Sequence, residues 1–537
     1  SVLRIKMTAI VDVKDGSEHK VTWADLKKEM RLHTGTVVMC LFLTFGGFAH
    51  GYDNGVIGGT QVMSPFRVAM GWPEDASVTN SKTTSEAQWI TGAFCIGACI
   101  SGFFGGQLTD VFGRKKVFCV GGILFATGGA IQSFGSSYLT MILGRAVAGV
   151  AIGALSCVAP MYSCELATPM MRGMLTSFYQ INVDVAIVIS SILTYAMRNV
   201  YVGWRVALGV QVVLGVIMCF GVLFVPESPK WLLRKGRKEE CMASLQRLRG
   251  CDDHIAEEYR MLEKEVEKEQ MDGAGAEYTW REVFSTSKVY NTFIIGGLLQ
   301  FFQIVTGINA IIFFSPSMFG VIGISPFIGG LAGNITFLVG TIIEVLIVDL
   351  VGRRKLLVGG MFMQAVSILA AGVVCAVYNN DLTGHTGAGA FVVICICLFL
   401  GFFGLGYGPG AWVYCSEMFS PQARGKGIGF TTAVNWGTNI LTAFGTPPMF
   451  ASASYGTSGA FFTFGALCLV CLPFTYLMIP EIKGVPLEGM SHLFDVDAIG
   501  GWKAFTRANR KGVVPDAARV GMYPEKSVDK ESQPVSR

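Results

Sequence analysis

The sequence predicts an all-α membrane protein with twelve transmembrane helices in two groups of six and an intracellular helical linker between them. Three observations predict this fold class. Of 537 residues, 51% are hydrophobic and only 15% are charged, whereas soluble chains are about 25% charged. Twelve apolar runs are each long enough to cross a bilayer. Short charged sequence motifs from the first half of the chain recur in the second half.

The apolar runs define the predicted helices. A helix needs about 20 predominantly apolar residues to cross the hydrocarbon core. The first group of runs covers residues 36–60, 88–109, 117–134, 138–162, 174–198 and 203–225. The second group covers residues 289–316, 326–348, 355–378, 388–416, 426–450 and 456–479. The even split predicts two six-helix halves.

The composition excludes several classes of function. The net charge of +4 is too small to indicate a nucleic-acid partner. We find no phosphate-binding glycine loop with its lysine, no metal-ligand cluster and no nucleophile elbow in the sequence. An enzyme is therefore not expected, and neither is a cofactor or a metal.

Positive charges predict the orientation. Lys and Arg gather around Arg114–Lys116, around Arg353–Lys355 and through 230–288, while the alternate loops carry few. The positive-inside rule then places both termini in the cytoplasm. Within the charged linker, 238–249 and 255–269 are predicted as surface-lying amphipathic helices. The predicted segments are a cytoplasmic 1–35, an N-terminal half 36–226, a linker 227–288, a C-terminal half 289–480 and a cytoplasmic tail 481–537.

An internal duplication supports the two-half plan. The motif from Asp110 to Lys115 resembles that from Asp349 to Arg354, and Pro226-Glu227 resembles Pro480-Glu481. The charged residues of these motifs lie at predicted cytoplasmic helix ends. Ion pairs that form there in one conformational state and break in another could hold the two halves together as a latch. Alternatively, they are ordinary interfacial charges. The predicted latch residues are Asp110, Arg114, Glu165, Arg172, Glu227, Asp349, Arg353, Glu417, Arg424 and Glu481.

Several motifs, in this order and spacing, resemble one known family over residues 45 to 490. They are Gly51-Tyr52-Asp53, Gly113-Arg114-Lys115, Gly144-Arg145, Pro226-Glu227-Ser228-Pro229, Gly307-Ile308-Asn309, Gly352-Arg353-Arg354, Gly408-Pro409 with Trp412, and Pro480-Glu481. The chain resembles the sugar porters of the major facilitator superfamily. That resemblance implies the major facilitator fold, alternating access, a monosaccharide substrate such as glucose, galactose or fructose, and a functional monomer in the lipid bilayer.

Two opposite charges fall inside predicted spans. Asp53 lies in the first span and Arg145 in the fourth. An unpaired charge in the membrane costs roughly 3 kcal/mol on insertion scales, so the two are expected to pair. In related proton-coupled porters the matching Asp accepts the proton and the Arg is its partner, which favours proton symport. A static ion pair is the alternative. His50, three residues before Asp53, could tune the proton or simply be a neutral hydrogen-bonding residue.

A sugar site needs amides and carboxylates for hydroxyls and flat rings for C–H faces. The resemblance places such groups at Gln180, Gln303, Asn309, Trp412 and Asn435, with gate aromatics at Phe313 and Phe314. Asp184, where the family has an apolar or hydroxyl residue, could bind a substrate hydroxyl, a proton or a cation, or be a locally paired carboxylate.

Two departures from the family pattern leave the identity of the sugar open. Ile304 replaces a second glutamine, and Phe337 stands at an asparagine position. The alternatives to proton–hexose symport in the plasma membrane are a facilitative carrier of a sugar or of a polyol such as inositol, and a non-transporting sugar sensor.

Overall fold

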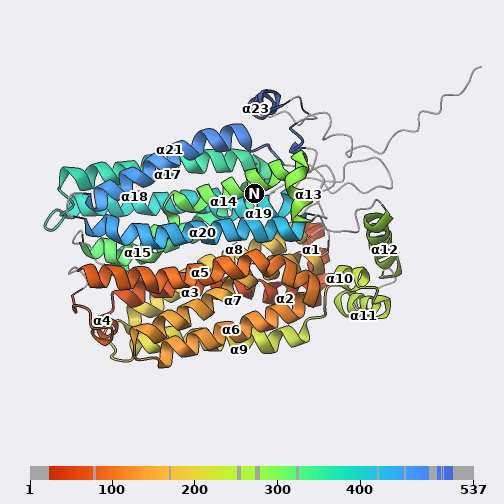
Figure 1. Ribbon diagram of the computed structural model, residues 1–537, viewed down its shortest axis with the longest axis horizontal. Coiled ribbons are helices and arrows are strands. Elements are labelled where there is room, and N and C mark those ends of the chain that lie inside the picture. Colours follow the sequence, from red (N-terminus) through yellow and green to blue (C-terminus); the bar gives the residue numbers. More distant parts are fainter. Residues whose placement is uncertain are drawn as a thin grey trace, which may run out of the picture.

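The computed structural model describes residues 23–75, 80–168, 171–250, 255–271, 279–321, 326–419, 423–452, 455–482, 493–496, 499 and 501–511. Long helices run side by side along the longest axis of the molecule (Figure 1). The helices of the N-terminal half are α2 (Thr34–Leu43), α3 (Phe45–Gln61), α5 (Ser81–Phe112), α6 (Arg114–Phe134), α7 (Tyr138–Leu166), α8 (Arg172–Met197) and α9 (Gly203–Gly221). Those of the C-terminal half are α14 (Ser287–Val305), α15 (Ile308–Val321), α16 (Pro326–Val351), α17 (Arg353–Val377), α18 (Thr386–Leu405), α19 (Tyr407–Met418), α20 (Arg424–Ala451) and α21 (Gly456–Met478).

Shorter helices lie at the two ends of the bundle. The short helix α4 (Ser64–Ala69) lies at one end, and a 3-10 turn, Val222–Phe224, follows α9. At the other end lie α1 (Trp23–Leu32), α10 (Pro229–Arg234), α11 (Lys238–Arg249), α12 (Ile255–Met271), α13 (Trp280–Ser285) and α23 (Trp502–Lys511). The first and last helices that the structure describes therefore share an end with the linker.

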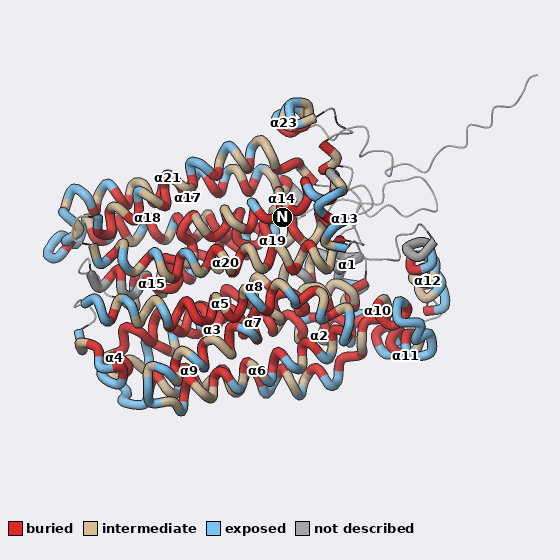
Figure 2. Tube along the Cα trace, in the orientation of Figure 1, coloured by how far each residue is buried: buried red, intermediate tan, exposed pale blue. Residues whose placement is uncertain are grey.

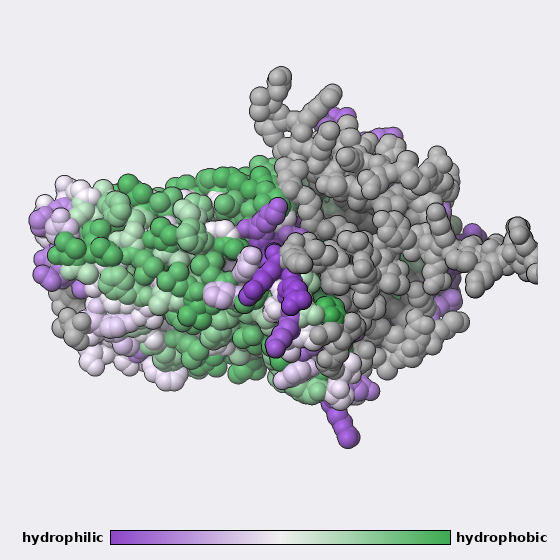
Figure 3. Space-filling model, turned by 90° about the horizontal axis from the view of Figure 1, so that it is seen from above, coloured by the Kyte–Doolittle hydropathy of each residue, from purple (hydrophilic) through white to green (hydrophobic). Residues whose placement is uncertain are grey.

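The lateral surface of the bundle is apolar. Large side chains such as Phe220, Phe224 and Leu139 are more than 60% exposed, and apolar residues cover the flank of the bundle in Figure 3. Exposed residues otherwise gather at the loops of both ends, while buried ones fill the centre (Figure 2). Since contiguous exposed apolar surface of this extent marks contact with lipid, the bundle is built to lie in a membrane.

Eleven helical segments of the described residues are long and apolar enough to cross a membrane. The predicted eleventh span, α20, is not among them, although it is 28 residues long and packs along α5. Its buried face carries Asn435, Asn439 and several threonines, which lower its mean hydropathy. A helix with this polar face is stable in a membrane because neighbouring helices cover that face.

Three predicted spans are each built from two helices. The first breaks at Thr44, whose hydroxyl accepts a hydrogen bond from Asn182 of α8 at 2.8 Å. The seventh breaks at Gly307, which has φ +97°, a conformation that favours glycine. The tenth breaks at Gly406, two residues before Gly408 of the Gly408-Pro409 motif. Broken helices expose backbone polar groups inside the bundle, as the membrane-embedded sites of carriers require.

The duplication extends to atomic contacts. The Glu227 carboxylate accepts hydrogen bonds from the backbone N–H of Arg114 at 3.1 Å and of Lys115 at 3.2 Å. The Glu481 carboxylate does the same with Arg353 at 3.1 Å and Arg354 at 3.2 Å. Each carboxylate thus caps the positive N-terminus of a helix.

A second repeated contact lies beside each cap. The Tyr162 hydroxyl donates to the Pro226 carbonyl at 2.5 Å, and the Tyr414 hydroxyl donates to the Pro480 carbonyl at 3.1 Å. Four contacts in matching places show that the two halves share one plan.

Three helix pairs make most of the contacts between the halves. A Cβ on Gly106 of α5 would lie only 2.2 Å from the Gly425 carbonyl oxygen of α20, so these backbones touch near the linker end. Towards the other end, the rings of Trp89 and Phe444 on the same two helices pack edge to face at 5.0 Å. The other two pairs are α8 with α16 and α3 with α15.

Candidate functional site

A buried ion pair lies inside the N-terminal half. Arg145 donates from its guanidinium to Asp53 Oδ2 at 2.6 Å, and both side chains are fully buried. Helices α3 and α7 position these groups. The structure therefore brings together the two charges that the sequence predicted to pair. A buried pair of this kind is held by mutual neutralisation, because either charge alone is strongly disfavoured there.

The arginine has further anchors. Its Nε donates to the Ile90 carbonyl at 3.1 Å, and its guanidinium lies 4.4 Å from the centroid of the Phe94 ring. These α5 contacts hold Arg145 independently of Asp53. A cation fixed in this way keeps its position whether the neighbouring carboxylate is protonated or ionised.

An amide pair completes the environment of the carboxylate. Gln211 of α9 donates to Asp53 Oδ1 at 3.0 Å, and Gln132 of α6 donates to Gln211 Oε1 at 3.1 Å. Neither glutamine was predicted as a site residue from the sequence. Each is a lone amide in an apolar run, and this signal could have identified them.

A network of amides fills the centre of the C-terminal half. Asn435 donates to Gln300 Oε1 at 2.8 Å and to Gln303 Oε1 at 2.7 Å. Asn309 donates to Asn439 Oδ1 at 2.6 Å. The predicted residues Gln303, Asn309 and Asn435 therefore come together with Gln300 and Asn439, which sequence analysis missed although Asn439 lies one helical turn after Asn435.

Gln303 also joins two of the broken helices. Its Nε2 donates to the carbonyls of Tyr407 at 3.0 Å and Gly408 at 2.9 Å. These carbonyls belong to the first turn of α19, directly after the break at Gly406. The amide network is thus coupled to the place where the tenth span bends.

A second group of polar side chains lies on α8. Gln180 donates to Asp184 Oδ1 at 2.8 Å, and Asp184 is fully buried. The carboxylate also lies beside the hydroxyl of Thr341 on α16, across the boundary between the halves. The predicted pair Gln180 and Asp184 is therefore brought together, on the opposite half from the amide network.

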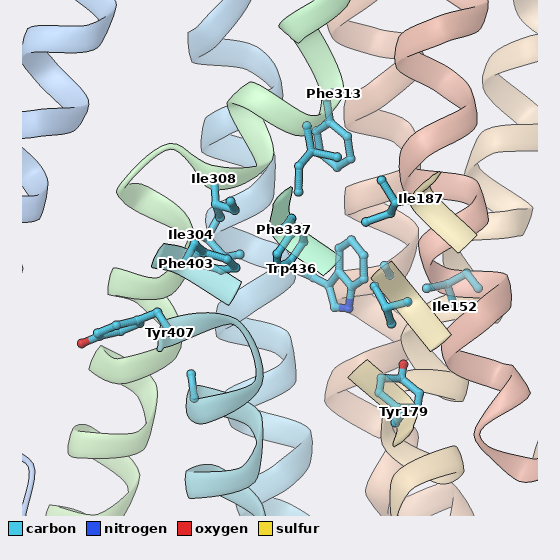
Figure 4. Packing of buried hydrophobic residues seen from close by; sticks show 14 of the residues in the cluster. Ile152, Tyr179, Ile187, Ile304, Ile308, Phe313, Phe337, Phe403, Tyr407 and Trp436 are labelled. Carbon is cyan, nitrogen blue, oxygen red and sulfur yellow. The ribbon is translucent and has the colours of Figure 1, made fainter. Parts of the chain in front are cut away.

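Aromatic residues from both halves meet between these groups. Trp436 of α20 is 1% exposed, and its ring lies 5.2 Å from His50 and 5.4 Å from Phe94. Figure 4 shows the indole between Phe337 on one side and Ile187 on the other. The Nδ1 atom of His50 lies 3.3 Å from the Tyr179 hydroxyl. Trp436 thus contacts the N-terminal half from the C-terminal half.

The predicted gate residues are buried. Phe313 and Phe314 of α15 are 1% and 3% exposed, and their rings pack edge to face at 6.3 Å. A Cβ on Gly58 of α3 would lie 2.7 Å from the Phe313 carbonyl oxygen, so the two halves touch here as well. Trp412 lies on α19 and is only partly buried.

The predicted latch residues lie in several different environments. Arg114 pairs with Asp110 at 3.1 Å and with Glu165 at 2.9 Å, all within the N-terminal half. Asp110 also faces the other half, since a Cβ on Gly425 would lie 2.7 Å from its Oδ2. The remaining members are two helix caps, Glu227 and Glu481, and three residues at helix ends, Arg353, Glu417 and Arg424. The side chains of Arg172 and Asp349 lie outside the described part, and the latch stays a prediction.

Together, the lipid-facing bundle, the repeated halves and the polar groups buried within them define an integral, multi-pass membrane carrier. The chain belongs to the sugar transporter family, because the family model described as "Sugar (and other) transporter" matches residues 39–494. Homologues of this family are transporters rather than enzymes.

Individual relatives cover most of the chain. It is 30% identical over 477 residues to the H(+)/hexose cotransporter 1 of Parachlorella kessleri, covering 85% of this chain and 87% of that one. It is 29% identical over 476 residues to a protein of Aspergillus niger described as "Probable quinate permease", with shares of 85% and 87%. A solved structure of the MFS proton:xylose symporter XylE bound to 6-bromo-6-deoxy-D-glucose matches with a TM-score of 0.72 at 22% identity, covering 86% of this chain and 100% of that one. That match shows the major facilitator fold.

Proposed function

We propose that the protein moves a monosaccharide, a hexose such as glucose, galactose or fructose, across the membrane by alternating access in symport with protons. The observation that carries the proposal is the fully buried pair of Asp53 and Arg145. Because Arg145 has its own anchors on Ile90 and Phe94, Asp53 can be protonated without releasing the arginine. The carboxyl is therefore suited to take up a proton in one state and release it in another.

The amides supply groups for sugar hydroxyls. Gln300, Gln303, Asn309, Asn435 and Asn439 bond to one another at 2.6–3.3 Å, so each of these amides can exchange an internal partner for a hydroxyl of similar strength. The H(+)/hexose cotransporter among the relatives supports a hexose and a proton as the two cargoes. Gln180 and Trp412 would complete the site, with Phe313 and Phe314 as gate.

Alternating access is supported by the contacts between the halves. Gly106 meets Gly425 near the linker end, and Gly58 meets Phe313 on α15. The two halves share one architecture and touch at several places. A rocking motion that opens one end of the bundle and closes the other could therefore form similar contacts in both states. The common end of α1, the linker helices and α23 supports placing both termini in the cytoplasm, and the plasma membrane is the proposed location.

The test is uptake by proteoliposomes that contain the purified protein. An imposed proton gradient should drive labelled hexose above its equilibrium level. Asp53→Asn should abolish this accumulation but leave sugar exchange at equal concentrations on both sides largely intact. The matched control is Asp381→Asn, a loop carboxylate that accepts from the Thr383 backbone N–H at 2.9 Å and should leave accumulation unchanged. If Asp53→Asn still concentrates sugar, proton coupling at Asp53 is wrong. If the wild type equilibrates sugar without accumulating it, the protein is a facilitative carrier.

A further inference from the structure

The helix α23 has a basic side that faces away from the protein. Its sequence contains four lysines or arginines and no acidic residue. The side chains of Lys503, Arg507 and Arg510 are exposed, and their spacing of four and three residues aligns them along one side of the helix. Phe505 and Asn509, on the other side, are only 1% and 5% exposed. The helix therefore has one side packed on the protein and one charged side.

The packed side fixes the depth at which α23 lies. Asn509 Nδ2 donates to the Leu477 carbonyl at 2.8 Å, in the last turn of α21. Helix α21 is long and apolar enough to cross the membrane, and it ends at Met478. A helix held to this last turn lies where α21 leaves the hydrocarbon core, which is the level of the lipid headgroups.

The helix also lies at the outer edge of the bundle. In Figure 1, α23 lies beyond α21, outside the outline of the long helices. Figure 3, which looks onto this side of the molecule, shows strongly hydrophilic residues where the apolar flank ends. On that flank, Leu469 and Val470 of α21 are 48% and 59% exposed. Because lipid surrounds such a flank, α23 overlies lipid rather than the interior of the bundle.

Two exposed aromatic residues lie at the same level. Tyr476, directly before Leu477, and Trp502, at the start of α23, are each 43% exposed. Tyrosine and tryptophan favour the membrane–water interface, because their rings are largely apolar and carry one polar group. The Trp502 ring also packs edge to face on Phe505 at 5.7 Å, which fixes it beside the packed side of the helix. Both positions agree with a helix at the bilayer surface.

The basic side lacks acidic partners in the protein. Within the described part of the chain, none of Lys503, Arg507 and Arg510 forms an ion pair. At headgroup level these charges lie within a Debye length, about 10 Å, of the membrane surface. Each such charge strengthens binding to an anionic membrane by roughly fivefold. The phosphate and carboxylate groups of acidic phospholipids therefore complement this side.

We propose that α23 is a binding site for anionic phospholipid headgroups, which Lys503, Arg507 and Arg510 contact while Trp502 lies among them. The site serves the leaflet at the linker end, the proposed cytoplasmic side, where anionic lipids are concentrated. It ties the C-terminal tail to the membrane beside the C-terminal half. The inference requires only that the bundle spans a membrane, so it holds whichever substrate or coupling ion the protein uses.

The test is hydrogen–deuterium exchange of the purified full-length protein in nanodiscs, measured by mass spectrometry of peptides that cover residues 501–511. One set of discs contains phosphatidylcholine alone, and the other contains phosphatidylserine as well. The amides of α23 should exchange at least about fivefold more slowly in the anionic discs, because lipid binding suppresses local opening of the helix. Salt at about 0.5 M should remove most of this difference, because the Debye length falls to about 4 Å.

The decisive variant combines Lys503→Gln, Arg507→Gln and Arg510→Gln. Since all three side chains are exposed and Asn509 keeps its bond to Leu477, the variant should keep the wild-type melting temperature. Its α23 amides should exchange equally fast in both kinds of disc.

The matched control is Lys27→Gln, Lys28→Gln and Arg31→Gln on α1. These three side chains are also exposed, and α1 lies at the same end of the bundle. The control removes the same number of positive charges from the protein, so it separates a local effect at α23 from a general effect of net charge. It should keep the slower exchange of α23 in the anionic discs.

Two outcomes would overturn the inference. In the first, α23 of the wild type exchanges equally fast in both kinds of disc, as expected if its basic side is merely solvated or binds an acidic protein. In the second, the triple α23 variant keeps the slower exchange in anionic discs, as expected if Trp502 alone holds the helix to the bilayer. Neither outcome affects sugar transport or the Asp53 experiment.

Discussion

The contact between Gly106 of α5 and Gly425 of α20 predicts how the halves are held at the linker end. In Gly106→Ala the new Cβ would lie 2.2 Å from the Gly425 carbonyl oxygen. This separation is about 1 Å shorter than a close carbon–oxygen contact, which is roughly 3.3 Å. Both atoms are backbone-fixed, so the helices must separate. Overpacking of this kind costs about 1–3 kcal/mol, which shifts an equilibrium between closed and open arrangements about 5- to 150-fold.

A native cysteine can report this opening. The Cys99 thiol on α5 donates to the Ala433 carbonyl of α20 at 3.4 Å, so it lies on the same boundary. We expect maleimide to label Cys99 at least fivefold faster in Gly106→Ala, measured by mass spectrometry of the purified protein. The control is Gly445→Ala on α20, where a Cβ would meet nothing within 4 Å. If Cys99 reacts equally fast in both variants, the glycine contact does not hold the halves together.

Three further substitutions test single contacts. Gln303→Leu should lower the unfolding temperature, because each carbonyl of the α19 turn that loses its donor costs about 1–3 kcal/mol; an unchanged temperature would contradict the role of Gln303 at the break. Tyr162→Phe and Tyr414→Phe should each lose about 1 kcal/mol by denaturant unfolding, and clearly unequal losses would show that the matching contacts are not equivalent. Gln211→Leu removes the second donor of Asp53 and should lower proton-driven accumulation about tenfold, while unchanged accumulation would show that Gln211 is dispensable.

The sequence predicted the helices better than the contacts between them. Apolar runs locate the spans, but they say little about where a span breaks. The break at Thr44 carries no proline, and the Thr44 hydroxyl there accepts a hydrogen bond from Asn182 of another helix, a contact that no local pattern encodes. The same limit applies to α20, whose polar face is compatible with the membrane only because α5 and α14 cover it.

In the candidate site, too, the sequence predicted individual residues better than the contacts between them. Asp53 and Arg145 could be paired from sequence because isolated charges in a membrane need each other. The partners of Gln211 and Asn439 could not be predicted in the same way, since a single amide in an apolar helix can bond to many partners. The acidic residues of the repeated motifs were visible in the sequence, but nothing in those motifs showed that Glu227 and Glu481 bind backbone N–H groups.

The paired caps have a mechanical consequence. Glu227 opens the linker and Glu481 opens the C-terminal tail, yet each carboxylate is fastened to the turn that starts α6 or α17. Gly113 and Gly352, at those turns, have φ of +91° and +98° and leave room for the carboxylate, since a Cβ on either would lie 2.5 Å from its oxygen. A force on the linker is therefore transmitted to the start of α6, and a force on the tail to the start of α17. Each acts on one half only, and the two points are equivalent in the two halves.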